Sequence, residues 1–239
     1  MRKWLLGSVL ALSVGVAGLA SAGAALYHDD FSSDTFGYNG QSQGWGSSDF
    51  GDAFWFPDKG FLASGNSDAP HEKFIWLTGD AKWADVAVST GIKVDQGTGY
   101  AGVILRAKDN KTYYEFRFTS GAPGLSDQEK AAGIWNPLGS PSYRIFKYVD
   151  GVPQLLAGVV SSSLFTLPGM QNGGNYDDKV LEFKFAAQGS QLTGYVKVPG
   201  GDFVPVVTAQ DSQLTSGQVG LDHWEYEPFF DYINVDQLP

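Results

Sequence analysis

The sequence predicts an all-β domain, an antiparallel β-sandwich of the jelly-roll type. Short runs of alternating apolar and polar residues follow one another through most of the chain. Glycine turns separate many of these runs, as at Asp150-Gly151, Gln188-Gly189 and Ser216-Gly217. No long amphipathic helix is predicted beyond residue 22. Many short strands joined by tight turns within one long domain are typical of a sandwich or a jelly roll.

The first 22 residues are predicted to be a signal peptide. Arg2 and Lys3 precede an apolar run from Trp4 to Leu19, and Ala20-Ser21-Ala22 matches an A-x-A cleavage site. A retained membrane anchor is the alternative, but the run is short, contains glycine and lacks a charged stop-transfer segment. We therefore expect a secreted or periplasmic protein with one domain, residues 23–239, and no membrane partner after cleavage.

The composition limits both partners and chemistry. The chain has 16 basic and 26 acidic residues, and removal of Arg2 and Lys3 leaves 14 against 26, a net charge of about −12. Such a charge repels nucleic acid and anionic membranes, and it disfavours a polyanionic glycan unless a local basic patch is present. Because the chain has no cysteine, disulfides, thiol catalysis and cysteine–zinc sites are excluded.

Each strand is predicted from an alternating or short apolar run bounded by turn residues. In chain order the predicted strands are Leu26–Phe31, Phe54–Phe56, Gly60–Ser64, Phe74–Leu77, Val86–Val94, Tyr100–Ala107, Thr112–Thr119, Tyr143–Tyr148, Gln154–Val160, Val180–Ala187, Gln191–Val198, Phe203–Thr208, Gln218–Leu221 and Phe229–Asp236. Three polar segments are predicted as loops or insertions: Gly37–Gly51, Ser120–Ser142 and Leu167–Asp178. Within the second, Ser126-Asp127-Gln128-Glu129 matches a capping box and predicts a short helix.

The segment Tyr100–Thr119 predicts a hairpin with two chemically different faces. One face carries the apolar residues Ala101, Val103, Leu105, Tyr114, Phe116 and Phe118. If these residues face one core, the opposite face collects Arg106, Tyr113, Glu115 and Arg117. The hairpin therefore predicts both the fold and a candidate site.

Several motifs follow one another along the chain in a characteristic order. They are Tyr27-His28-Asp29-Asp30-Phe31, Trp45 in a loop, the hairpin GYAGVILRAKDNKTYYEFRF, Tyr143–Tyr148 with Asp150-Gly151, and SGQVGL followed by Phe230–Val235. In this order the chain resembles the laminin-G-like members of the concanavalin A-like lectin and glucanase superfamily. That superfamily includes carbohydrate-binding modules, lectins, glycoside hydrolases, polysaccharide lyases and adhesion domains, so the fold alone does not choose a function.

The catalytic motifs of the enzymes in that superfamily are missing. Laminarinase-like hydrolases carry an E-x-D-x-x-E strand, and jelly-roll alginate lyases carry R-T-E-L, Q-I-H and K-A-G-x-Y-x-Q strands. None of these occurs in this chain. The resemblance therefore supplies no catalytic residues, and the catalytic residues, if any, stay unknown.

The function that these residues favour is binding of a polysaccharide on a concave sheet face. Aromatic rings stack on sugar rings, and Arg, Glu and Lys hydrogen-bond the hydroxyls. Tyr195 and Lys197, from an alternating run, are candidates for the same face as the hairpin residues. Trp135 of the insertion is expected to roof this face, and Trp224 is expected to contact sugar from the segment Asp222–Glu227, predicted as an exposed loop.

Two other functions stay open. An endo-acting lyase could use Arg106 or Arg117 to neutralise a uronate carboxylate and Tyr113 or a histidine to move the proton, whereas a hydrolase could use Glu225 and Glu227. The third possibility is a structural or adhesion module, in which the charged face only carries cross-strand Arg–Glu pairs.

Calcium is the one cofactor that the resemblance implies, as a structural ion near the chain termini. The first and last strands are expected to adjoin, which brings together Asp29, Asp30 and Asp231, and we expect Asp30 and Asp231 to be the ligands. Asp177-Asp178 with Asn172 and Asn175 form a rival cluster. His28, His71 and His223 have no metal-binding spacing, so zinc is not expected.

Overall fold

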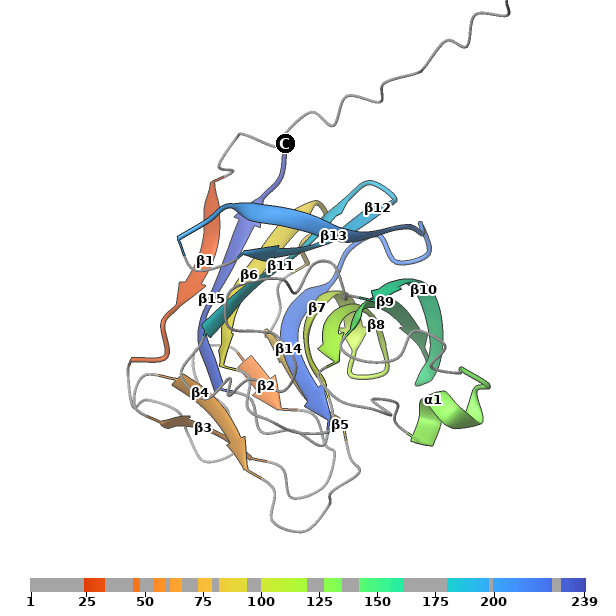
Figure 1. Ribbon diagram of the computed structural model, residues 1–239, viewed down its shortest axis with the longest axis horizontal. Helices are drawn as coiled ribbons and strands as arrows, with labels where there is room; N and C mark the ends of the chain where they lie inside the picture. Colours follow the sequence, from red (N-terminus) through yellow and green to blue (C-terminus); the bar gives the residue numbers. More distant parts are fainter. Residues whose placement is uncertain are drawn as a thin grey trace, which may run out of the picture.

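The computed structural model describes residues 24–32, 45–47, 54–58, 61–65, 73–78, 82–93, 100–119, 127–134, 142–160, 180–197, 200–224 and 229–239. These residues form two antiparallel sheets packed face to face (Figure 1). The predicted all-β sandwich of the jelly-roll type is thus confirmed. A short helix, α1 (Asp127–Ala131), lies where the capping-box motif predicts one. Among the described residues, no helix has the length and apolar character needed to cross a membrane.

One sheet has eight strands in the order β13-β12-β11-β6-β15-β4-β3, and β1 also pairs with β15. Its strands are β1 (Ala25–Asp29), β3 (Phe54–Asp58), β4 (Phe61–Gly65), β6 (Val86–Lys93), β11 (Val180–Gln188), β12 (Gln191–Lys197), β13 (Phe203–Gln210) and β15 (Phe229–Gln237). The first and last of these strands adjoin as predicted, with Asp29 opposite Ile233.

The other sheet has seven strands in the order β10-β9-β8-β7-β14-β5-β2. Its strands are β2 (Trp45–Ser47), β5 (Lys73–Thr78), β7 (Tyr100–Asp109), β8 (Thr112–Thr119), β9 (Ser142–Val149), β10 (Val152–Val160) and β14 (Gln218–Trp224). Strand β2 lies inside the segment Gly37–Gly51, which was predicted to be a loop. Its three residues pair with β5 but are too few to show alternation in the sequence.

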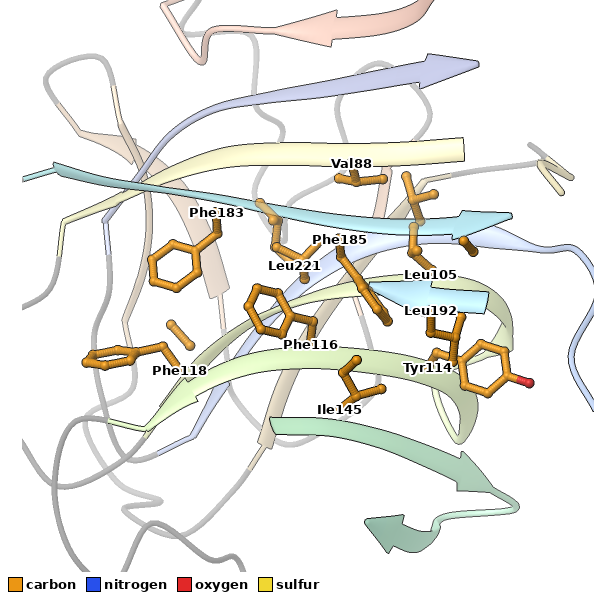
Figure 2. Close-up of a cluster of buried hydrophobic side chains, with 14 of the residues drawn as sticks. Val88, Leu105, Tyr114, Phe116, Phe118, Ile145, Phe183, Phe185, Leu192 and Leu221 are labelled. Atoms are coloured by element: carbon orange, nitrogen blue, oxygen red, sulfur yellow. The ribbon is translucent and has the colours of Figure 1, made fainter. Parts of the chain in front are cut away.

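The core lies between the sheets and is rich in aromatic rings (Figure 2). The ring of Phe116 on β8 packs against Phe183 and Phe185 on β11, at centroid distances of 6.1 and 5.8 Å. A side chain at Gly194 of β12 would place its Cβ 2.4 Å from the Phe116 ring, so glycine makes room for that ring. Because the inward side chains of both sheets are buried in this core, a functional site lies on an outer face, at a sheet edge or in the connecting loops.

Candidate functional site

The outer face of the seven-stranded sheet carries a cluster of charged and aromatic side chains. Alternation on β8 directs Phe116 and Phe118 into the core and Glu115 and Arg117 away from it. Strand register places Asp222, Gly102, Arg117 and Arg144 in one row across β14, β7, β8 and β9. We use the name Arg117 cluster for Tyr100, Tyr113, Glu115, Arg117, Glu129, Arg144, Phe146, Tyr148, Asp222 and Trp224.

The guanidinium of Arg117 lies at the centre of this cluster between two aromatic rings. Its Cζ is 3.9 Å from the centroid of the Tyr100 ring and 4.0 Å from that of Phe146. Its Nη1 donates to Glu129 Oε1 at 2.5 Å and to Glu115 Oε1 at 3.4 Å. Burial alone would lower the pKa of Arg117, but the two carboxylates outweigh burial and raise this pKa well above its ordinary value. The arginine is therefore a fixed, buried cation.

Two donors of this cation are not used by the described part of the chain. Arg117 Nε and Nη2 have no hydrogen-bond partner among the described residues, and neither do the hydroxyls of Thr119 and Ser142. Thr119 and Ser142 face each other on β8 and β9, one row further along the sheet from Arg117. Buried polar groups without partners are costly and are rare in protein structures. These buried atoms therefore keep hydrogen-bonding capacity that the described residues do not use.

Helix α1 covers the opposite side of the cluster. Its Glu129 is fully buried and accepts hydrogen bonds from Arg117 and, at 2.7 Å, from the Tyr148 hydroxyl. Tyr148 stacks on Tyr113 with ring centroids 4.7 Å apart, and Ile134 packs against the same small apolar group. The described part of the insertion Ser120–Ser142 therefore does lie over the predicted face.

The charges of the cluster are closely balanced. Burial, together with the neighbouring charge of Arg117, lowers the pKa of Arg144 to about 10. A Cβ at Gly102 would lie 2.4 Å from Asp222 Oδ1 and 3.2 Å from Arg117 Cβ, so glycine lets the Asp222 carboxylate lie beside the arginine. Two guanidinium groups thus share one face with the carboxylates of Glu115, Glu129 and Asp222.

Tyr113, Glu115, Arg117 and Trp224 are brought together as the sequence predicted, but not on an open surface. Each has at most 2% of its surface exposed. Trp224 stacks on Tyr100 with the centroids 6.0 Å apart, at the end of β14. The exposed loop predicted over Asp222–Glu227 is therefore wrong for Asp222–Trp224, which form a buried strand end. Trp135, Glu225 and Glu227 lie outside the described residues.

Arg106 does not join this face, which corrects the prediction from strict alternation. The residue has a φ of 52°, and the pairing register of β7 and β8 shifts directly after Leu105. This β-bulge turns the side chain to the end of the sandwich. There the guanidinium bonds the carbonyls of Ala84, Gly189 and Leu214 and the carboxylate of Asp85, at 2.8–3.0 Å. Arg106 therefore has a structural role, because it joins a strand of one sheet to the β11–β12 turn of the other. We call Arg106 and these hydrogen bonds the clasp.

Tyr195 and Lys197 do not join the Arg117 cluster either. Both are on β12, which belongs to the eight-stranded sheet, and their side chains alternate with the core residue Val196. They consequently lie on the opposite outer face of the sandwich. Alternation predicted correctly that they point away from the core, but it carries no information about which sheet a strand joins.

The structure adds residues that the sequence did not nominate. Arg144, Phe146 and Tyr148 alternate along Ser142–Val149, so the reasoning applied to the hairpin would have found them. Tyr100 and Asp222 follow from the pairing of β7 with β14. No local sequence pattern predicts the position of Glu129, because it reaches the cluster through the tertiary placement of α1. The capping-box motif identified its helix, not its contact with Arg117.

The predicted calcium ligands, Asp30 and Asp231, lie after β1 and on β15, two strands that adjoin. Asp30 is exposed and its Oδ1 accepts hydrogen bonds from the backbone and hydroxyl of Ser32. Asp231 is on β15, where burial and nearby Glu182 raise its pKa. The described part of the chain contains no group of three or more acidic, histidine or cysteine side chains placed to hold a metal ion. Calcium binding at Asp30 and Asp231 stays a prediction.

Comparison with solved structures places the fold. A Bacillus subtilis protein of unknown function with a galectin-like fold has a TM-score of 0.60 and 14% identity, covering 91% of this chain and 97% of that one. The carbohydrate-binding module CBM66 from Bacillus subtilis has a TM-score of 0.56 and 18% identity, with 82% and 96% covered. The exoplasmic/lumenal domain of VIP36, in a Ca2+/Man3GlcNAc-bound form, has a TM-score of 0.56 and 10% identity, with 83% and 86% covered.

These similarities show that the chain has the concanavalin A-like jelly-roll fold, as the sequence motifs predicted. No protein-family model matches the chain, and no curated protein matches it. The sequence identities are too low to transfer a function, so the argument for function depends on the residues of the outer face.

Proposed function

We propose that this protein is an exported carbohydrate-binding β-sandwich whose ligand binds at the Arg117 cluster. The observation that carries the proposal is a fully buried guanidinium, held between two aromatic rings, with two donors that no described residue satisfies. Sugar hydroxyl or carboxylate oxygens are acceptors that suit these donors. The predicted signal peptide supports export.

The physical argument is that the sandwich does not require this cluster. Its hydrophobic core lies between the sheets, whereas the Arg117 cluster lies on the outer face. Removing several charges from water is expensive, and a well-packed apolar patch would cover a sheet face at lower cost. Clusters of this kind are concentrated at functional sites.

The direction of approach follows from the position of α1. Glu129 occupies the side of Arg117 that faces Tyr148, whereas Thr119 and Ser142 flank the arginine on the other side. A sugar would therefore reach Arg117 from the Thr119–Ser142 side, which requires the buried Thr119 and Ser142 to become exposed. There it would meet Tyr100 and Trp224, which lie in the same row as Thr119, and the hydroxyls of Thr119 and Ser142. The two solved structures whose names refer to a carbohydrate-binding module and a bound glycan support this choice of ligand class.

A cleaving enzyme that uses the same face is the second candidate. Glu115 and Glu129 both contact Arg117 Nη1, so their Oε1 atoms lie at most about 6 Å apart, which allows the roughly 5–5.5 Å carboxyl separation of retaining glycoside hydrolases. Binding is favoured because both carboxylates are engaged in holding the guanidinium. Neither faces the Thr119–Ser142 side from which a sugar would approach.

The proposal is tested by retention of the protein on affinity gels that contain different polysaccharides, followed by titration with the retained glycan. Arg117→Lys keeps the charge but loses the planar, multi-donor geometry, so we expect its affinity to fall by about tenfold or more. Arg106→Lys is the matched control, because it makes the same change outside the cluster. Circular dichroism checks that both variants are folded.

Each outcome has a defined meaning. Unchanged affinity in folded Arg117→Lys would refute the proposed site. Release of new reducing ends or of unsaturated, ultraviolet-absorbing products would replace the binding function with hydrolase or lyase activity. Absence of retention on every glycan, together with a persistent oligomer, would favour a structural or adhesion module.

A further inference from the structure

The outer face of the eight-stranded sheet carries a second, independent group of cations and rings. Lys184 on β11 pairs with Tyr195 on β12, and Lys197 on β12 lies opposite both Glu182 and Phe203. These side chains point away from the core, because they alternate with Phe183, Phe185 and Val196. We call this group the Lys184 patch; its members are Glu182, Lys184, Tyr195, Lys197 and Phe203. All five are partly exposed.

Lys184 is a half-buried ammonium seated on aromatic rings. Its Nζ lies 3.9 Å from the centroid of the Phe203 ring and 5.3 Å from that of Tyr195. Such cation–π contacts hold the charge in place without using its hydrogen-bond donors. Among the described residues, Lys184 makes neither a hydrogen bond nor an ion pair.

The neighbouring cation is already neutralised. Lys197 Nζ lies 2.8 and 3.0 Å from the two oxygens of Glu182, and Tyr232 also donates to Glu182, at 2.9 Å. The positive charge of Lys197 is therefore offset, whereas that of Lys184 is not offset by a direct contact. Burial lowers the pKa of Lys184, and Asp236 partly opposes this effect through space. The Lys184 patch thus offers one ammonium beside two partly exposed rings.

We propose that the Lys184 patch binds a uronic acid residue of an otherwise neutral glycan. One ammonium matches a singly charged carboxylate, which would pair with Lys184 Nζ. Tyr195 would stack against the apolar C–H face of the sugar ring. Glu182 and Asp231 on the same face would repel a dianionic phosphate or a dense polyanion. This inference is independent of the Arg117 cluster, because the two sites lie on opposite outer faces.

The test uses two oligosaccharides that differ in one group. A xylo-oligosaccharide bearing one glucuronic acid is titrated into the full protein, and so is the same oligosaccharide after reduction of its carboxyl to an alcohol. We expect the acidic form to bind at least about tenfold more tightly, which is the effect of one charge-assisted contact. Equal affinity for the two forms would overturn the proposal.

Variants then locate the contact. Lys184→Gln should bring the affinity for the acidic oligosaccharide to that for the reduced one. Lys111→Gln removes the same charge from an exposed turn residue and should change neither affinity. Arg117→Lys should leave the difference between the two oligosaccharides intact, which separates this site from the Arg117 cluster. If Lys184→Gln is folded and still prefers the acidic form, or if Arg117→Lys abolishes that preference, the patch is not the uronate site.

Discussion

Arg117 shows how one side chain can define a site at the residue scale. It pairs with Glu129 and Glu115 and is stacked between Tyr100 and Phe146. A lysine in its place would keep the charge, but it lacks the planar group that lies between the two rings and the separate Nε and Nη2 donors. The outer face therefore depends on the geometry of a guanidinium and not only on its charge.

The Tyr114 hydroxyl forms a second important set of hydrogen bonds, and its contribution to stability depends on pH. Its hydroxyl donates to Asp211 at 2.5 Å and accepts from the backbone of Leu214 at 3.0 Å, while Lys147 bonds the same carboxylate at 2.6 Å. Burial, reinforced by the hydrogen bond to Asp211, raises the pKa of Tyr114 from 10.0 to about 12. This group favours the folded state most while the phenol is protonated.

The sign of the pH effect follows from that raised pKa. The contribution of Tyr114 is fully present below the unfolded pKa of 10.0 and is lost as the pH rises towards about 12. We expect Tyr114→Phe to lower the free energy of unfolding by about 1–2 kcal/mol at neutral pH. Between pH 10 and 12 the wild-type protein should lose stability more steeply than the variant. Denaturant titrations at several pH values measure this, and parallel pH profiles would contradict it.

At the scale of elements, the β-bulge in β7 explains why Arg106 does not share a face with Arg117. Strict alternation predicted that Tyr113, Glu115 and Arg117 share a face, and it was right because β8 pairs regularly with β9. It was wrong for Arg106, because one left-handed residue reverses the side of the strand. Its failure for Tyr195 and Lys197 has another cause, since alternation cannot say which sheet a strand joins. Likewise, a local pattern cannot place Glu129.

The clasp makes a prediction that distinguishes it from a ligand-binding arginine. In Arg106→Lys an ammonium cannot reach all of the carbonyls of Ala84, Gly189 and Leu214. We expect the free energy of unfolding to fall by about 2 kcal/mol or more, because buried carbonyls lose their donors. Affinity for the retained glycan, measured well below the unfolding temperature, should not change. A loss of affinity without a loss of stability would instead indicate that Arg106 contacts the ligand.

At the scale of the whole molecule, the fold was predictable and the exposure of the site was not. The run of alternating segments and the order of the motifs were enough to predict a concanavalin A-like sandwich, since both depend on local chemistry. Burial of Arg117 and Tyr148 depends in part on how α1 docks against β8 and β9, which is a property of the tertiary structure. The two outer faces differ accordingly, with a buried Arg117 cluster on one and a partly exposed Lys184 patch on the other.

The most direct test of the central claim is a crystal structure of the protein with the glycan that the affinity gels retain. We predict a sugar oxygen within hydrogen-bonding distance, about 2.7–3.2 Å, of Arg117 Nε or Nη2. We also predict contacts from that sugar to the hydroxyl of Thr119 or Ser142. A glycan bound elsewhere on the molecule, with the donors of Arg117 satisfied by the protein itself, would contradict the assignment of the Arg117 cluster as the carbohydrate site.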